Sequence, residues 1–169
     1  MHRFTWDLRY PGPWQSAARP EGPNGPSAVP AMYAVRLTSG SWTATRPLKI
    51  VEDPRNLQDG VTVSDLREQF EHNMRVRDLV SDVNRTVARL RAAMSSSSGE
   101  KEIKLRDLSK QLITPSIRYS EPELQTQITY LYTVTNSTDQ KPGRDVVERR
   151  EALRKDLERR IQELDAILK

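Results

Sequence analysis

The chain has 169 residues, of which 36% are hydrophobic, 6% aromatic and 30% charged. This composition argues against one large globular core and is typical of long amphipathic helices with solvated outer faces. The 27 Lys and Arg residues exceed the 23 Asp and Glu residues by only four, which does not by itself indicate a nucleic-acid-binding surface, and the absence of cysteine excludes disulfides, thiol nucleophiles and zinc–thiolate sites.

The N-terminal third of the sequence is predicted to contain three strands. Apolar and polar residues alternate over Arg3–Tyr10, which predicts a half-buried strand. Residues 11–31 are rich in Pro, Gly, Ser and Ala, so we expect a long surface loop there. Two further alternating runs, 32–38 and 42–51, flank a Ser-Gly-Ser turn and predict a hairpin. Pro47 lacks a backbone donor and is expected at a sheet edge or a bulge.

Three short strands cannot cover both faces and both edges of a sheet by themselves. The helices could fold back onto the sheet, earlier strands of a sandwich could precede this sequence, or another subunit could complete it. We favour the second and third arrangements. The aromatic side chains in this part of the sequence are then candidate protein-contact residues, although packing between the sheet and the helices is the alternative. They are Phe4, Trp6, Trp14, Tyr33 and Trp42.

A helical bundle is predicted for residues 57–169, after a strand segment that covers residues 1–56. Apolar residues recur at spacings of three and four, which predicts three long antiparallel helices at about 63–94, 120–136 and 145–168. The fold class is therefore α+β.

The ends of these helices carry recognisable signals. Ser64 and Asp145 are expected to cap the first and last long helices, and Ser120 with Glu123 forms a predicted capping box. A shorter helix is expected before Pro115.

Candidate catalytic groups are sparse. His2 lies at the chain end, and His72 lies in a predicted helix with no other metal ligand at a suitable spacing, so we expect an exposed histidine. The carboxylates of the last helix alternate with Arg and Lys as ordinary surface ion pairs, and none marks a glycosidase cleft. The glycosylation sequons at Asn84 and Asn136 are interpreted as chance matches. We predict no catalytic, cofactor-binding or metal-binding residue, and no enzymatic activity.

Three stretches of the sequence carry a family resemblance: FTWDLRYPGP, VPAMYAVRLTSGSWTATRPLKIVEDPR and SDLREQFEHNMRVRD. Together with the later stretch that begins SIRYSEPELQTQ, they resemble the C-terminal region of bacterial exported proteins with sortilin-like or BNR-repeat β-propellers, often labelled glycosyl hydrolases. The resemblance implies a fibronectin-like partial sandwich followed by a helical tail, located in the periplasm or at the cell surface. The propeller and its Asp-box repeats are absent, so no catalytic position can be carried over.

The leading hypothesis is a non-catalytic interaction module, either an accessory subunit or a processed C-terminal piece. It would dock on and stabilise a larger extracytoplasmic or membrane-associated complex. One alternative is a carbohydrate-binding or glycosyl hydrolase-associated domain. Another is a basic nucleic-acid binder, which we rank last and do not predict, because acidic residues interleave with the arginines of the last helix. No apolar run approaches the roughly 20 residues of a transmembrane helix.

Overall fold

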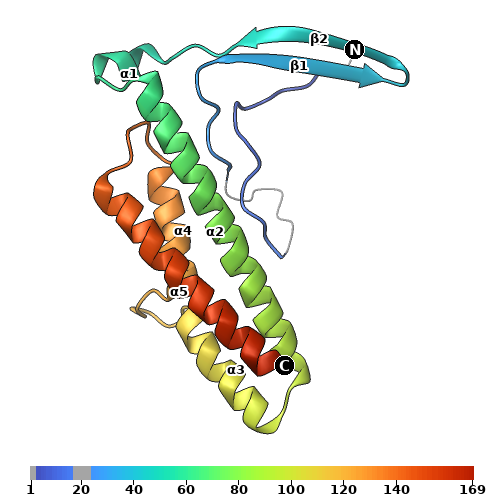
Figure 1. Ribbon diagram of the computed structural model, residues 1–169, viewed down its shortest axis with the longest axis vertical. Helices are drawn as coiled ribbons and strands as arrows, with labels where there is room; N and C mark the ends of the chain where they lie inside the picture. Colours follow the sequence, from blue (N-terminus) through green and yellow to red (C-terminus); the bar gives the residue numbers. More distant parts are fainter. Residues whose placement is uncertain (1–2, 17–23) are drawn as a thin grey trace.

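The computed structural model describes residues 3–16 and 24–169 and confirms an α+β fold class (Figure 1). His2 and part of the predicted loop 11–31 therefore lie outside the described residues. A two-stranded antiparallel hairpin comes first and helices follow. The elements are β1 (Met32–Ser39), β2 (Trp42–Lys49), α1 (Pro54–Gln58), α2 (Val63–Ser96), α3 (Gly99–Leu112), α4 (Leu124–Thr135) and α5 (Arg144–Leu168).

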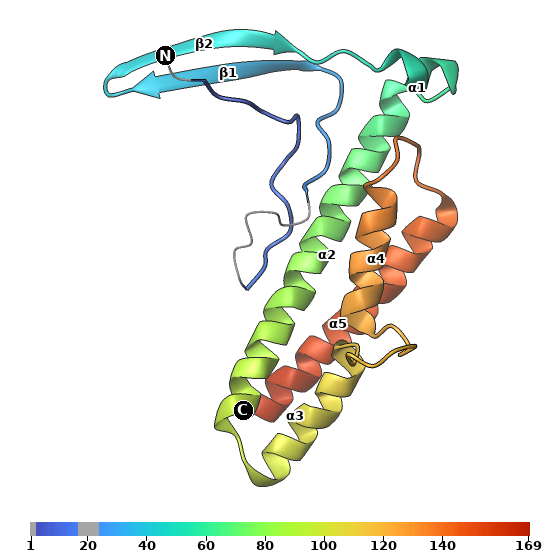
Figure 2. The ribbon, with the colours of Figure 1, turned by 180° about the vertical axis from the view of Figure 1, so that it is seen from behind.

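The helical part is a bundle built on α2. α3 and α4 follow one another along α2 in the opposite direction, and α5 returns in the direction of α2 (Figures 1 and 2). The expectation of three long helices is thus only roughly right, because the middle one is two shorter helices separated by residues 113–123. Pro115 and Pro122 lie in this break, where each disfavours helical backbone at the residue before it.

The hydrophobic core lies between these helices. Val76, Val83 and Leu90 follow one another at intervals of seven residues along α2 and are fully buried, as expected for one apolar stripe. The other three helices of the bundle complete the core with Leu105, Leu108 and Leu112 of α3, Ile128 and Tyr132 of α4, and Leu153, Leu157 and Leu164 of α5. Outside the helices, the buried residues among those described are Pro13, Gly25, Pro26 and Ala28, and none of them lies in the hairpin. The bundle therefore has a complete core without the hairpin.

Two predicted helix caps are wrong. Thr62, and not Ser64, caps α2: the Thr62 hydroxyl accepts a hydrogen bond from the Asp65 backbone N–H at 3.2 Å, and the Asp65 carboxylate accepts one from the Thr62 N–H at 3.0 Å. This reciprocal pair is a capping box. At α5 the N-cap is Gly143, and Asp145 lies inside the first turn, where its charge favours the helix N-terminus without capping it.

The start of α4 also differs from the prediction. The helix begins at Leu124 after Glu123, and the Ser120 hydroxyl donates to the Ile117 carbonyl at 2.7 Å instead of capping. The Glu123 N–H donates to Thr114 Oγ1 at 2.8 Å, which holds the connection from α3 as a loop up to that point.

The predicted hairpin is confirmed. Ser39 pairs with Trp42 across a two-residue turn, and Gly40 has φ 58 at the first central position, as a type II′ turn requires. β2 ends at Lys49 and not near Val51. A short helix, α1, then follows where only the end of the strands was expected, because the Asp53 carboxylate accepts a hydrogen bond from the Arg55 N–H at 2.9 Å and caps it.

The predicted strand over Arg3–Tyr10 is wrong. Only an isolated bridge between Arg9 and Ser27 forms there, with a hydrogen bond from the Ala28 N–H to the Leu8 carbonyl at 2.7 Å. Leu8 has φ 61, so the backbone turns out of the extended conformation at the point where a strand would continue. The alternating pattern was present, but these residues pair with neither strand of the hairpin.

Candidate functional site

The hairpin has one apolar face. Because side chains alternate along a strand, the observed register places Tyr33, Val35 and Leu37 of β1 on the same face as their β2 partners. Those partners are Leu48, Arg46 and Ala44, and the Ser39–Trp42 pair continues the face to the turn. We call this set the exposed hairpin face. Six of its eight side chains are apolar or aromatic.

The outer half of this face is uncovered. Val35 is 51% exposed, Leu37 63% and Trp42 54%. Neither strand packs against a helix within the described residues, and the hairpin projects sideways from the α1 end of the bundle (Figure 1). Clustered exposure of large apolar side chains is unusual and marks an interaction surface more often than scattered exposure does.

The inner half is anchored by the N-terminal segment. The Trp6 ring meets the Tyr33 ring edge to face, with centroids 6.1 Å apart, and the Tyr33 hydroxyl donates to the Val29 carbonyl at 2.8 Å. Burial, followed by the neighbouring Tyr10, raises the pKa of Tyr33. The Tyr10 ring in turn packs on Phe70 of α2, with centroids 4.9 Å apart. These contacts fix the base of the hairpin and leave its turn end free.

The five candidate contact residues are thus only partly brought together. Trp6 and Tyr33 touch and are half-buried, Phe4 is 90% exposed, and Trp42 lies at the turn end of the hairpin. Trp14 lies elsewhere.

Trp14 belongs to the flank of α2. The Trp14 backbone N–H donates to Ser81 Oγ at 3.0 Å, and the Trp14 ring centroid lies 5.6 Å from the Arg85 guanidinium carbon. The Asn84 amide donates to the Trp14 carbonyl at 2.9 Å and accepts from Gln125, so the side chain of this sequon is already used within the fold. Trp14 and Trp42 therefore do not form one carbohydrate platform.

The charge of the hairpin region has one sign. Residues 24–51 contain Arg36, Arg46 and Lys49 and no Asp or Glu, although 23 acidic residues occur in the whole chain. Arg46 lies on the exposed hairpin face, and Arg36 and Lys49 lie on the opposite face of the hairpin.

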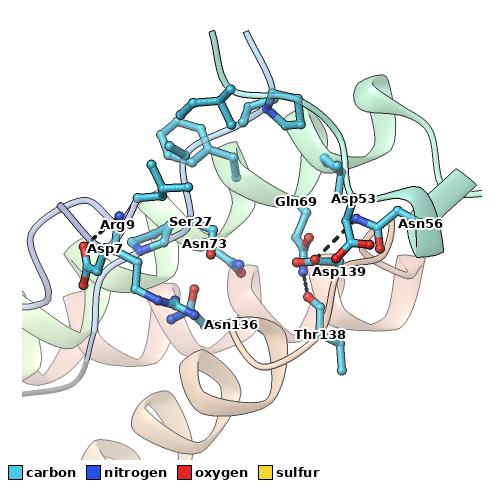
Figure 3. A pocket seen from close by; sticks show the side chains of 18 of the residues that line it. Asp7, Arg9, Ser27, Asp53, Asn56, Gln69, Asn73, Asn136, Thr138 and Asp139 are labelled. Atoms are coloured by element: carbon cyan, nitrogen blue, oxygen red, sulfur yellow. Dashed lines mark hydrogen bonds between the residues drawn. The ribbon is translucent and has the colours of Figure 1, made fainter. Parts of the chain in front are cut away.

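A cavity of about 280 Å³ lies below the hairpin, between the N-terminal segment, α2 and the loop from α4 to α5 (Figure 3). Two side chains of α2 organise this junction. Gln69 Nε2 donates to the Thr135 carbonyl at 3.0 Å and also to the Thr138 carbonyl, and Asn73 Nδ2 donates to the Thr135 carbonyl at 3.0 Å. They satisfy carbonyls that the end of α4 would otherwise leave without a partner.

The carboxylates around this cavity are engaged in local contacts. Asp7 accepts a hydrogen bond from the Arg9 N–H at 3.0 Å, and Asp139 accepts one from the Asn56 amide at 3.4 Å. Hydrogen bonds from Arg55 lower the pKa of Asp53 to about 2, so it stays ionised. No three His, Asp or Glu side chains among the described residues are placed to hold a metal ion. The cavity is lined by both polar and apolar side chains, and it lies where the hairpin, the N-terminal segment and the bundle meet.

The prediction of an exposed His72 is wrong, because its side chain is buried and only 3% exposed. Its Nδ1 lies 3.3 Å from the Arg150 guanidinium of α5. Burial, and then the charges of Arg150 and Arg75, lower the pKa of His72 to about 4. The ring is therefore neutral near pH 7. Gln69, His72 and Asn73 continue the three-and-four spacing of the apolar stripe, which was the available signal for their burial.

No family model, curated protein or solved structure matched this chain. The resemblance to the C-terminal region of propeller-bearing exported proteins therefore stays a prediction. Among the residues that the structure describes, no helix combines the length and apolarity needed to cross a bilayer.

Proposed function

We propose that this chain is a non-catalytic protein-interaction module that docks on a larger protein through the exposed hairpin face. The single observation that carries the proposal is the exposure of Val35, Leu37 and Trp42 on a hairpin that the bundle does not cover. The bundle needs nothing from the hairpin, since its own core is complete. The hairpin, in contrast, lacks a cover.

Docking would stabilise the hairpin as well as the complex. A two-stranded sheet alone is marginally stable in water, and fully burying a large apolar side chain contributes about 1.5–3 kcal/mol. Trp42 has the size and position of an interface anchor, because buried tryptophans are prominent among the residues that dominate binding energy. The anchored base presents this surface in a fixed direction.

We also propose where the chain acts and what kind of partner it binds. The family resemblance supports an extracytoplasmic location, in which the chain acts as an accessory subunit or a processed C-terminal piece that stabilises a larger extracytoplasmic or membrane-associated complex. The positive charge of the hairpin supports a partner with an acidic surface.

A matched pair of variants tests docking. Leu37 on the hairpin and Ile103 on α3 are 63% and 62% exposed. We expect Leu37→Asp to abolish co-purification of a stoichiometric partner from source cells, measured by native mass spectrometry after crosslinking, and Ile103→Asp to leave it unchanged. Equal recovery with both variants, or a wild-type chain that is recovered only as a lone monomer, would contradict the proposal.

A further inference from the structure

The phase of the hairpin ladder determines which backbone groups face outward. The Ile50 N–H donates to the Ala31 carbonyl at 2.9 Å, so this pair belongs to the hydrogen-bonded set. In an antiparallel ladder hydrogen-bonded and non-hydrogen-bonded pairs alternate. The pairs that direct their N–H and C=O groups away from the partner strand are therefore Met32–Lys49, Ala34–Pro47, Arg36–Thr45 and Thr38–Thr43.

The outer edge of β2 is poorly suited to accept another strand. Pro47 occupies one of its outward positions and has no N–H to donate. At the next outward position the Thr45 carbonyl already accepts a hydrogen bond from the Arg46 guanidinium at 3.1 Å. This edge therefore offers an interrupted row of donors and acceptors.

The outer edge of β1 offers an uninterrupted row of backbone donors and acceptors. Ala34, Arg36 and Thr38 each present both an N–H and a carbonyl outward, and no backbone hydrogen bond reaches them from residues 3–16 or 24–169. Such an edge is a template for strand addition.

The side chains beside this edge define the chemistry of the added strand. On one side it would meet Val35 and Leu37, and on the other Arg36, with no acidic residue between 24 and 51. A nucleic acid would satisfy the charge but would leave the apolar face exposed, and a second copy of the chain would bring the same positive charges. A strand that alternates apolar and acidic residues satisfies both faces.

We infer that the partner binds by adding an amphipathic acidic β-strand to the outer edge of β1. This inference rests on the proposed docking function and specifies its edge and its partner. The added strand extends the hairpin to three strands, and the domain that carries it covers the exposed hairpin face.

NMR of the full chain tests the edge directly. The probe is a synthetic eight-residue peptide of alternating Val and Glu, added to isotope-labelled protein. We expect hydrogen exchange of the Ala34, Arg36 and Thr38 amides to slow at least tenfold, while the outward amides of Thr43 and Thr45 do not change. A peptide with Lys in place of Glu should bind at least tenfold more weakly.

Two proline variants provide a matched comparison. Thr38 and Thr43 face each other and share a hydrogen bond between their hydroxyls at 3.2 Å, so Thr38→Pro and Thr43→Pro lose the same side-chain contact. Each also loses one outward N–H, on β1 and β2 respectively. We expect Thr38→Pro to weaken peptide binding at least fivefold and Thr43→Pro to leave it unchanged.

The inference would be overturned by protection of the β2 amides in hydrogen exchange or by equal effects of the two proline variants on peptide binding. Equal binding of the Lys and Glu peptides, or tighter binding of duplex DNA than of the Glu peptide, would also overturn it. So would a dimer through β1 in sedimentation without peptide. Co-purification separates the two proposals. If Leu37→Asp abolishes recovery of the partner but Thr38→Pro does not, docking stands and strand addition at β1 fails. If neither variant affects recovery, the proposed function itself fails.

Discussion

Protonation of His72 should destabilise the helical bundle at mildly acidic pH. The folded protein holds this ring neutral with a pKa of about 4, whereas the unfolded chain has the ordinary value of 6.5. Between these values the unfolded state binds more protons, so stability is fully present above about pH 6.5 and falls as the pH decreases toward 4. At about 1.4 kcal/mol per pH unit, the loss reaches about 3 kcal/mol at pH 4.

Urea unfolding at a series of pH values measures this loss, with His72→Gln as the control. Glutamine keeps a polar group beside Arg150 but does not titrate. Acidic groups such as Asp53 and Glu151, whose pKa values are lowered, contribute acid sensitivity to both proteins. The difference between wild type and variant therefore isolates the histidine. A difference that stays constant from pH 7 to pH 4 would refute the assignment of a buried neutral ring.

Three other substitutions have expected outcomes in urea unfolding at pH 7. Leu90→Ala should lower the free energy of unfolding by about 2–5 kcal/mol, because the Leu90 side chain is fully buried. A loss no larger than that caused by Leu57→Ala, at an exposed position, would contradict the burial of Leu90 in the core. Thr62→Ala should cost about 1 kcal/mol through loss of the α2 capping box, and fraying of α2 in hydrogen exchange should accompany it. Tyr132→Phe should cost about 1 kcal/mol, because the hydroxyl donates to the Asn24 carbonyl at 2.6 Å; faster proteolysis near Asn24 is the second readout, and unchanged proteolysis would argue against that tether.

The sequence predicted the elements whose stabilising interactions are local. α2 and α5 follow from the spacing of their apolar residues, and the hairpin follows from alternation around Gly40. The prediction of a strand over Arg3–Tyr10 was wrong. Alternation indicates which side chains would share one face of a strand, but it does not indicate whether a neighbouring strand is available to pair with it. α1 was missed although Asp53 before Pro54 is a recognisable helix start.

The hydrogen bonds between α2 and the end of α4 could not be predicted in the same way. Gln69 and Asn73 bond to the Thr135 carbonyl, which lies more than sixty residues away in the sequence. Only the tertiary fold determines that distance. The apolar residues of the exposed hairpin face were predictable, but their exposure depends on where the bundle lies, which no local pattern specifies.

The length of α2 gives the molecule a long reach. Its 34 residues extend about 50 Å, from the hairpin end to the turn that leads into α3 (Figure 2). The other bundle helices α3, α4 and α5 pack against α2 along its length, and this packing stiffens it. A partner bound at the hairpin would thus be separated by about the length of α2 from a molecule bound at the turn between α2 and α3.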